Sequence, residues 1–150
     1  MPNHGRNSVI HGGGFHHLAI RAFDFDATLR FYIEGLGFEI AYGWGEDARN
    51  RGERDTRAAM LDTGDGNYVE VFAGGIERPN QEAPEGAILH YALRTSNCDA
   101  ALERARRAGA VVTMEPKTVP VGGEPPRDFR IAFVRGLDGE VIEFFQNDAL

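Results

Sequence analysis

The feature that most constrains the fold is an internal repeat with one period. Residues 17–29, "HLAIRAFDFDATL", align with residues 90–102, "HYALRTSNCDAAL", 73 positions later. The same interval places residues 65–72, "DGNYVEVF", on residues 138–145, "DGEVIEFF". Because two separate segments share one interval, we expect the chain to contain two copies of one structural unit.

Each copy reads as a strand followed by a helix and three further strands. The first helix is expected to begin at Asp24 or Asp26, and the second at Asn97 or Asp99, because short polar side chains cap helix N-termini. Gly109 is expected to end the second helix. In each copy the last two strands flank an Asp-Gly pair, which is a strong hairpin signal.

The unit is therefore β-α-β-β-β, and the fold class is α+β, with two tandem βαβββ modules that form half-barrels. The modules are assigned to residues 15–74 and 88–147. Together they form a single domain over residues 15–147, and the turn-rich residues 73–87 link them. Residues 1–14 are expected to be a flexible arm.

Each final strand contains a glutamate among β-forming residues, Glu70 in the first copy and Glu143 in the second. An unpaired buried carboxylate is costly. His17 and His90 open the first strand of each copy, at the same interval of 73 residues. If a pseudo-two-fold axis relates the modules, both His/Glu sets meet, and two imidazoles with two carboxylates suit a divalent metal. The alternative is a pair of hydrogen-bonded core histidines and two glutamates on solvated faces.

Other residues share the strand faces of these four. Arg21 and Arg94 lie four positions after each histidine, and Tyr68 and Phe72 flank Glu70 at a spacing of two. Residues two apart in a strand point to one face. We therefore expect all four to contact substrate, the arginines through a carboxylate or phosphate. A salt bridge at the rim is the alternative for the arginines.

Composition excludes several classes of partner. The net charge is −7 and the pI is near 5.2, without a basic stripe, so a nucleic-acid partner is not expected. The apolar runs are too short to span a membrane. The single cysteine, Cys98, fits a reducing cytoplasm and is expected to be a small buried hydrophobe.

Two motifs resemble the glyoxalase / vicinal oxygen chelate superfamily across about residues 15–147. "HHLAIRAFDFDATLRFYIEGLGFE" is similar to its opening strand and helix, and "FVRGLDGEVIEF" to its closing hairpin. The resemblance implies an open barrel that binds one divalent ion, nickel or zinc first, with cobalt, manganese or iron as further choices. The implied metal ligands are His17, Glu70, His90 and Glu143. This His-Glu-His-Glu set is similar to that of the lactoylglutathione lyases, the glyoxalase I group.

The resemblance implies a lyase or isomerase that moves a proton next to a carbonyl. The substrate would be a small molecule with vicinal oxygens, such as a 2-oxoaldehyde hemithioacetal. Glu143 is the expected base, with Glu70 as the alternative. Arg21 matches an arginine that helps to hold glutathione in that group, whereas Gly74 stands where an asparagine is usual.

Three other functions remain open. An extradiol-type iron(II) dioxygenase needs only two histidines and one carboxylate, so a fourth ligand at Glu70 argues against it. An enzyme that resembles methylmalonyl-CoA epimerase would usually have Gln at that position. A metal-free, bleomycin-resistance-like binding protein would typically lack the ligands. We expect a homodimer, with the modules closing either within one chain or across two.

Overall fold

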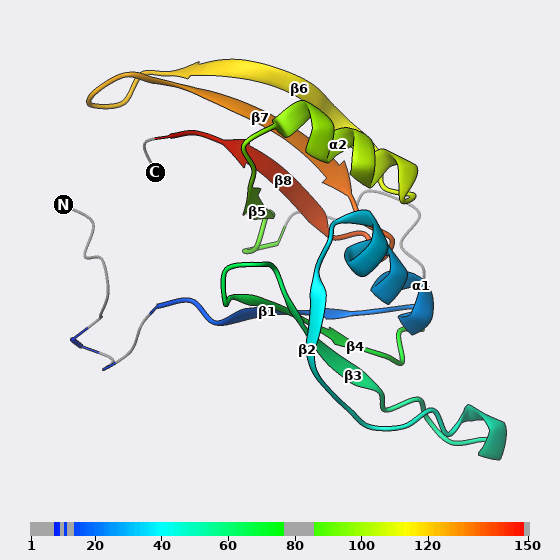
Figure 1. Cartoon of the computed structure of the whole chain (residues 1–150). Coiled ribbons are helices and arrows are strands. Elements are labelled where there is room, and N and C mark those ends of the chain that lie inside the picture. The colour runs from blue at the N-terminus through cyan, green and yellow to red at the C-terminus, as the bar shows by residue number, and fades with distance from the viewer. Residues whose placement is uncertain (1–7, 10, 12–13, 77–85, 149–150) are drawn as a thin grey trace.

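In the computed structural model, which describes residues 8–9, 11, 14–76 and 86–148, the chain forms the two modules that the repeat predicts (Figure 1). The first contains β1 (His17–Arg21), α1 (Phe25–Arg30), the π-helical turn η1 (Phe31–Gly35), β2 (Glu39–Trp44), the 3-10 turn η2 (Arg49–Arg51), β3 (Ala58–Asp62) and β4 (Tyr68–Phe72). The second contains β5 (Tyr91–Arg94), α2 (Cys98–Arg107), β6 (Val111–Val121), β7 (Arg127–Arg135) and β8 (Val141–Gln146). Most of the expected arm (1–14) and much of the linker (73–87) lie outside the described residues.

Each module builds one four-stranded mixed sheet. The strand order is β1-β4-β3-β2 in the first sheet and β5-β8-β7-β6 in the second. The first strand of each module runs parallel to the last, and the other neighbours are antiparallel. The predicted fold class is confirmed: two βαβββ modules form two open sheets, and no barrel closes among the described residues.

Side-chain caps fix where the helices begin. The carboxylate of Asp24 accepts a hydrogen bond from the Ala27 backbone N–H at 3.0 Å, and the Asn97 amide oxygen accepts one from Ala100 at 3.0 Å. These bonds satisfy N–H groups that lack partners within the helix. No helix in the described part of the chain has both the length and the apolar character needed to cross a membrane.

The glycine of each predicted Asp-Gly turn adopts a left-handed backbone conformation. The φ angle is 83° at Gly66 and 88° at Gly139. Glycine reaches this region without the steric penalty of a Cβ atom. The two turns therefore reverse the chain between β3 and β4 and between β7 and β8, as the sequence predicts.

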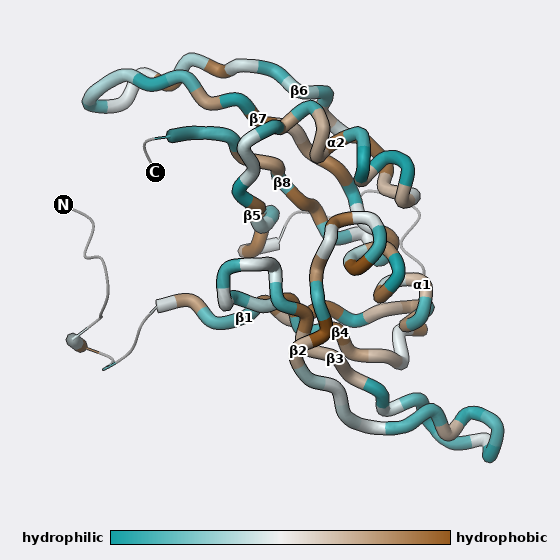
Figure 2. The backbone as a smooth tube through the Cα atoms, viewed as in Figure 1, coloured by the Kyte–Doolittle hydropathy of each residue, from teal (hydrophilic) through white to brown (hydrophobic). Residues whose placement is uncertain are grey.

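The hydrophobic core lies on the helix-facing side of both sheets, where apolar residues are concentrated along β4 and β8 (Figure 2). Val69 and Val71 of β4 are buried there, as are Ile142 and Phe144 of β8. Cys98 is a free, fully buried residue of the same core, as expected. The alternate residues of each strand point to the opposite side. We call these opposite sides the open face of the first sheet and the open face of the second sheet.

The modules meet where Gly35 approaches Ala108. A Cβ atom added to Gly35 would lie 2.5 Å from the Ala108 Cβ. Residue 108 is the repeat counterpart of residue 35, because the two are one repeat interval apart. A residue that touches its own counterpart lies on the axis that relates the copies. The pseudo-two-fold axis of the chain therefore passes through the contact between the two helical segments.

Hydrogen bonds join the modules beside this axis. Tyr32 of η1 donates to the Glu140 Oε1 at 2.7 Å, and its hydroxyl lies 2.5 Å from that of Tyr91. The Asp138 carboxylate accepts from the Thr28 hydroxyl at 2.6 Å. The turn between β7 and β8 is thus tied to the first module.

Candidate metal centre

The first sheet brings His17 and Glu70 together on its open face. Ala19 is paired with Glu70 across β1 and β4, so His17 lies one diagonal away from the glutamate. The His17 Nε2 is 3.2 Å from the Glu70 Oε2. The histidine side chain is 39% exposed and the glutamate 13%, so the pair lies at a surface that is open to solvent.

The second sheet repeats this arrangement with His90 and Glu143. The His90 Nε2 is 3.0 Å from the Glu143 Oε2, and the side chains are 35% and 11% exposed. The ring of Phe133 meets the His90 ring edge to face, with 5.1 Å between their centroids. Both predicted pairs therefore form, with the same atoms facing each other in each module.

The ring nitrogens of His17 have different partners. Its Nδ1 lies 2.9 Å from the Nδ1 of His16, while its Nε2 faces Glu70. If His17 donates through Nδ1, its Nε2 is left as an electron-pair donor. Histidines that bind metals are commonly held in this way by a hydrogen bond from the other nitrogen.

The donor atoms of each pair have the separation that a shared metal requires. Two donors at about 2.0–2.2 Å from one ion lie about 3.0 Å apart at a right angle and about 3.4 Å apart at the tetrahedral angle. The observed separations, 3.2 Å and 3.0 Å, fall within this range. Imidazole nitrogen with carboxylate oxygen also suits zinc, nickel and the other divalent ions expected from the sequence.

The two pairs do not come together within one chain. Among the described residues, which include all four predicted ligands, no group of three or more His, Cys, Asp or Glu side chains is placed to hold a metal. The position of the pseudo-two-fold axis explains this, because it passes through the helices and the pairs lie on sheet faces turned away from them. Each chain thus contains two separate His–Glu pairs.

The expected substrate residues of the first module lie beside the His17 pair. Arg21 donates to the Ala73 carbonyl at 2.8 Å, and its guanidinium lies 5.5 Å from the centroid of the Phe72 ring. The ring of Tyr68 is 5.0 Å from that of His16. Arg21 is therefore held by a backbone carbonyl and an aromatic ring, and no carboxylate among the described residues neutralises it.

Two aromatic residues of β2, Tyr42 and Trp44, extend this surface. Trp44 meets Phe72 at 6.0 Å edge to face, and Tyr42 stacks on Trp44 at 5.6 Å. Their spacing of two was the available signal, because it places both on one strand face. Trp44 is the last residue of β2 and therefore belongs to the sheet.

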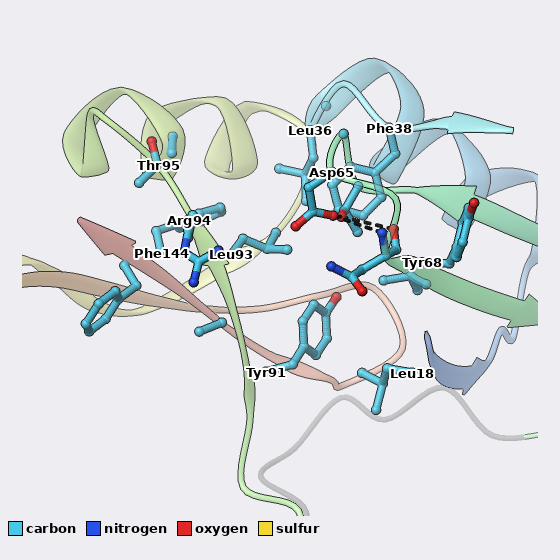
Figure 3. Close-up of a pocket in the computed structure, with 18 of the residues that line it drawn as sticks. Leu18, Leu36, Phe38, Asp65, Tyr68, Tyr91, Leu93, Arg94, Thr95 and Phe144 are labelled. Carbon is cyan, nitrogen blue, oxygen red and sulfur yellow. Dashed lines mark hydrogen bonds between the residues drawn. The ribbon is translucent and has the colours of Figure 1, made fainter. Parts of the chain in front are cut away.

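Arg94 and Tyr68 line a cavity of about 700 Å³ between the modules (Figure 3). Apolar side chains from both modules contribute to it, among them Phe38 and Leu93. None of the four predicted ligands is among its described lining residues. Arg94 is therefore directed to a space that differs from the surface around His17, although the two arginines are repeat counterparts.

The carboxyl group of Glu140 has a raised proton affinity. Burial raises the pKa of Glu140 to about 6, and the hydrogen bond from Tyr32 only partly offsets that effect. Burial also raises the pKa of Tyr32 well above its ordinary value. These groups lie at the contact between the modules.

Comparison with known proteins supports one family. The family model for the Glyoxalase/Bleomycin resistance protein/Dioxygenase superfamily matches residues 14–144. The uncharacterized protein YwbC of Bacillus subtilis is 31% identical over 132 residues, which cover 87% of this chain and 94% of that protein. Lactoylglutathione lyase GLX1 of Arabidopsis thaliana is 29% identical over 134 residues, which cover 88% of this chain but only 44% of the plant protein.

A solved structure agrees with the fold. The crystal structure of a glyoxalase I mutant from Zea mays superposes with a TM-score of 0.66 at 23% identity, covering 89% of this chain and 44% of that one. With the two open βαβββ sheets and the family match over most of its length, the chain belongs to the Glyoxalase/Bleomycin resistance protein/Dioxygenase superfamily.

Proposed function

We propose that the protein is a metal-dependent lyase or isomerase of the glyoxalase I type, which transfers a proton within a small substrate that carries vicinal oxygens. The observation that carries this proposal is the pair of equivalent His–Glu contacts, at 3.2 Å and 3.0 Å, one on each open face. Similarity to a plant lactoylglutathione lyase supports it. The substrate class is a 2-oxoaldehyde hemithioacetal or a close analogue.

The complete site is proposed to form between two chains. The open faces carry large apolar side chains in solvent: Tyr42 is 67% exposed and Val111 is 54% exposed. The edge strands β1 and β5 also have no neighbour on one side within the described residues. In a homodimer, His17 and Glu70 of one chain would complete the ligand set with His90 and Glu143 of the other.

When bound, a divalent ion would act as a Lewis acid toward two adjacent oxygens of the substrate. His17 and His90 would hold it through Nε2. Glu143 is the proposed base, because its side chain lies on the open face of the second sheet and is largely shielded from solvent. Glu70 occupies the equivalent position and is the alternative. Phe72 and Trp44 would limit the access of water, and Arg21 would pair with an anionic group of the substrate.

Metal content and assembly can be tested with one pair of variants. We expect His17→Ala and Glu143→Ala to be separately inactive on methylglyoxal hemithioacetals and to bind little nickel or zinc. When the two are mixed after brief unfolding, a shared site predicts that each mixed dimer contains one intact site and one site with both lesions. Activity and about one metal per mixed dimer should then return.

The controls separate the two parts of the proposal. In a dimer whose sites close within each chain, every site keeps one substituted ligand. Neither activity nor metal binding then returns on mixing. Wild-type protein that takes up none of nickel, zinc, cobalt, manganese or iron would refute the metal proposal. A strictly monomeric wild-type protein in light scattering would refute the shared site.

A further inference from the structure

We propose that Arg135 forms an anion-binding subsite on the open face of the second sheet, where it recognises a carboxylate of the substrate. This rests on the proposed function, since it concerns the same site. The unusual feature of Arg135 is its Nη1 atom, which is buried from solvent and has no hydrogen-bond partner among the described residues. Buried donors are normally paired, because an unmade hydrogen bond costs free energy.

Strand register places Arg135 beside the proposed base. Phe133 is paired with Glu143, and Arg135 is paired with Val141. Arg135 and Glu143 are therefore diagonal neighbours on one face of the sheet. Such neighbours are about 7–8 Å apart, within reach of a long side chain. Yet the Glu143 carboxylate contacts His90 at 3.0 Å, and no ion pair joins it to Arg135. Although its Nη1 atom is covered, Arg135 as a whole is only half-buried, so the guanidinium can meet an anion near the base.

The internal repeat fails at this position, and the failure has a structural meaning. The counterpart of Arg135 is Asp62. The Asp62 Oδ1 accepts hydrogen bonds from the backbone N–H groups of Gly64 and Gly66, at 2.7 Å and 3.2 Å, and so holds the turn of its module. In the second module, Glu140 accepts from the Asp138 N–H at 3.0 Å. The second turn therefore has its own carboxylate, and Arg135 is not needed to hold it.

The opposite charges of Asp62 and Arg135 make the two halves of the proposed site different, and this difference would orient a bound substrate. The His and Glu residues are the same in both modules, but the residue diagonal to the glutamate is an acid in the first and a cation in the second. A guanidinium presents a planar set of donors that matches a carboxylate. A substrate with two similar vicinal oxygens and one carboxylate would therefore bind with the carboxylate toward the second sheet, beside Glu143.

A matched pair of chelating probes tests the subsite. Butyrohydroxamate and succinic monohydroxamate share the chelating group, and differ in whether a methyl or a carboxylate ends the chain. With cobalt-loaded protein, changes in the visible absorption give both dissociation constants. We expect wild type to bind the carboxylate probe about 10- to 100-fold more tightly, as a charge-assisted hydrogen bond allows.

Variants at Arg135 should affect only one probe. Arg135→Gln should abolish the preference without changing the affinity for butyrohydroxamate, and Arg135→Lys should restore part of it, because lysine keeps the charge without the planar donors. Arg127→Gln is the control, since Arg127 lies on the same strand eight residues away. Equal weakening of both probes by Arg135→Gln, or no preference in wild type, would overturn the proposal. The proposal would also be overturned if Arg135→Gln weakened only the association of the two chains. The acceptor of the Arg135 hydrogen bond would then belong to a second copy of the chain and not to the substrate.

A metal-free measurement separates this proposal from the proposed function. In ¹⁵N-labelled protein without metal, the Nε signal of Arg135 is assigned by its absence from Arg135→Gln. We expect propionate to shift this signal to saturation and to leave the Arg127 signal in place. A saturable shift in a protein that binds no metal would retain the subsite and refute the metal chemistry. Absence of a shift would refute the subsite, whether or not the protein binds a metal ion.

Discussion

The carboxyl of Glu140 should make the free energy of unfolding depend on pH, and Glu140→Gln should remove that dependence. Burial raises the pKa of Glu140 from 4.5 to about 6, so the folded chain holds this proton more tightly than the unfolded chain. The resulting stabilisation is complete below about pH 4.5 and is lost as the pH rises through about 6. Each tenfold difference in proton affinity is worth about 1.4 kcal/mol, so the change between these limits is about 2 kcal/mol.

Urea unfolding of wild type and Glu140→Gln between pH 4.5 and 7.5 measures this change. The variant still offers an oxygen to Tyr32, but its amide cannot also accept from the Asp138 N–H, so an offset of about 1 kcal/mol at every pH is expected. On top of that offset, wild type should gain about 2 kcal/mol over the variant as the pH falls. Glu34→Gln, at an exposed position, is the control and should run parallel to wild type. If the curves of wild type and Glu140→Gln are also parallel, the reasoning is wrong.

Three further outcomes are expected. Gly35→Ala should lower the free energy of unfolding in urea by about 1–3 kcal/mol, because the new Cβ would lie 2.5 Å from that of Ala108. Ala108→Gly in the same chain should recover most of this loss. A double variant that is no more stable than Gly35→Ala would contradict this explanation. Asn97→Ala should cost about 1 kcal/mol in the same assay by removing the cap of α2, and no loss would show that the cap is dispensable. Removing divalent metal with a chelator should lower the melting temperature of wild type but not of His17→Ala, since only a folded site binds the ion; an equal decrease in both would count against the proposed ligand.

Much of the fold could be predicted because local chemistry and the repeat agree. The caps at Asp24 and Asn97 formed where short polar residues precede each helix. The length of β6 was harder to predict from the sequence, since Pro116 and Pro120 within Val111–Val121 are disfavoured in a strand in the interior of a sheet. β6 is an edge strand, where a missing N–H is tolerated. The π-helical turn over Phe31–Gly35 has no pattern of its own in the sequence.

The candidate site was predictable within each module but not between modules. One interval in the sequence identified both His–Glu pairs, because the contact of each pair depends only on the register of neighbouring strands. That interval is the same whether the modules close in one chain or across two. The close approach of Gly35 to Ala108 decides where the axis lies. This approach is possible because Gly35 has no side chain, and the periodicity of the sequence does not reveal such a contact. Arg135 was overlooked because it interrupts the repeat.

The axis through Gly35 and Ala108 also limits how copies can assemble. Each chain uses its helical surfaces for its own internal two-fold contact and leaves two sheet faces that point away from it. With the proposed pairing of open faces, two chains form a ring of four modules in which two kinds of contact alternate. Closure of that ring depends on the angle at the helix contact. A substitution that alters this angle would prevent closure, and the same faces would then join successive chains into an open filament.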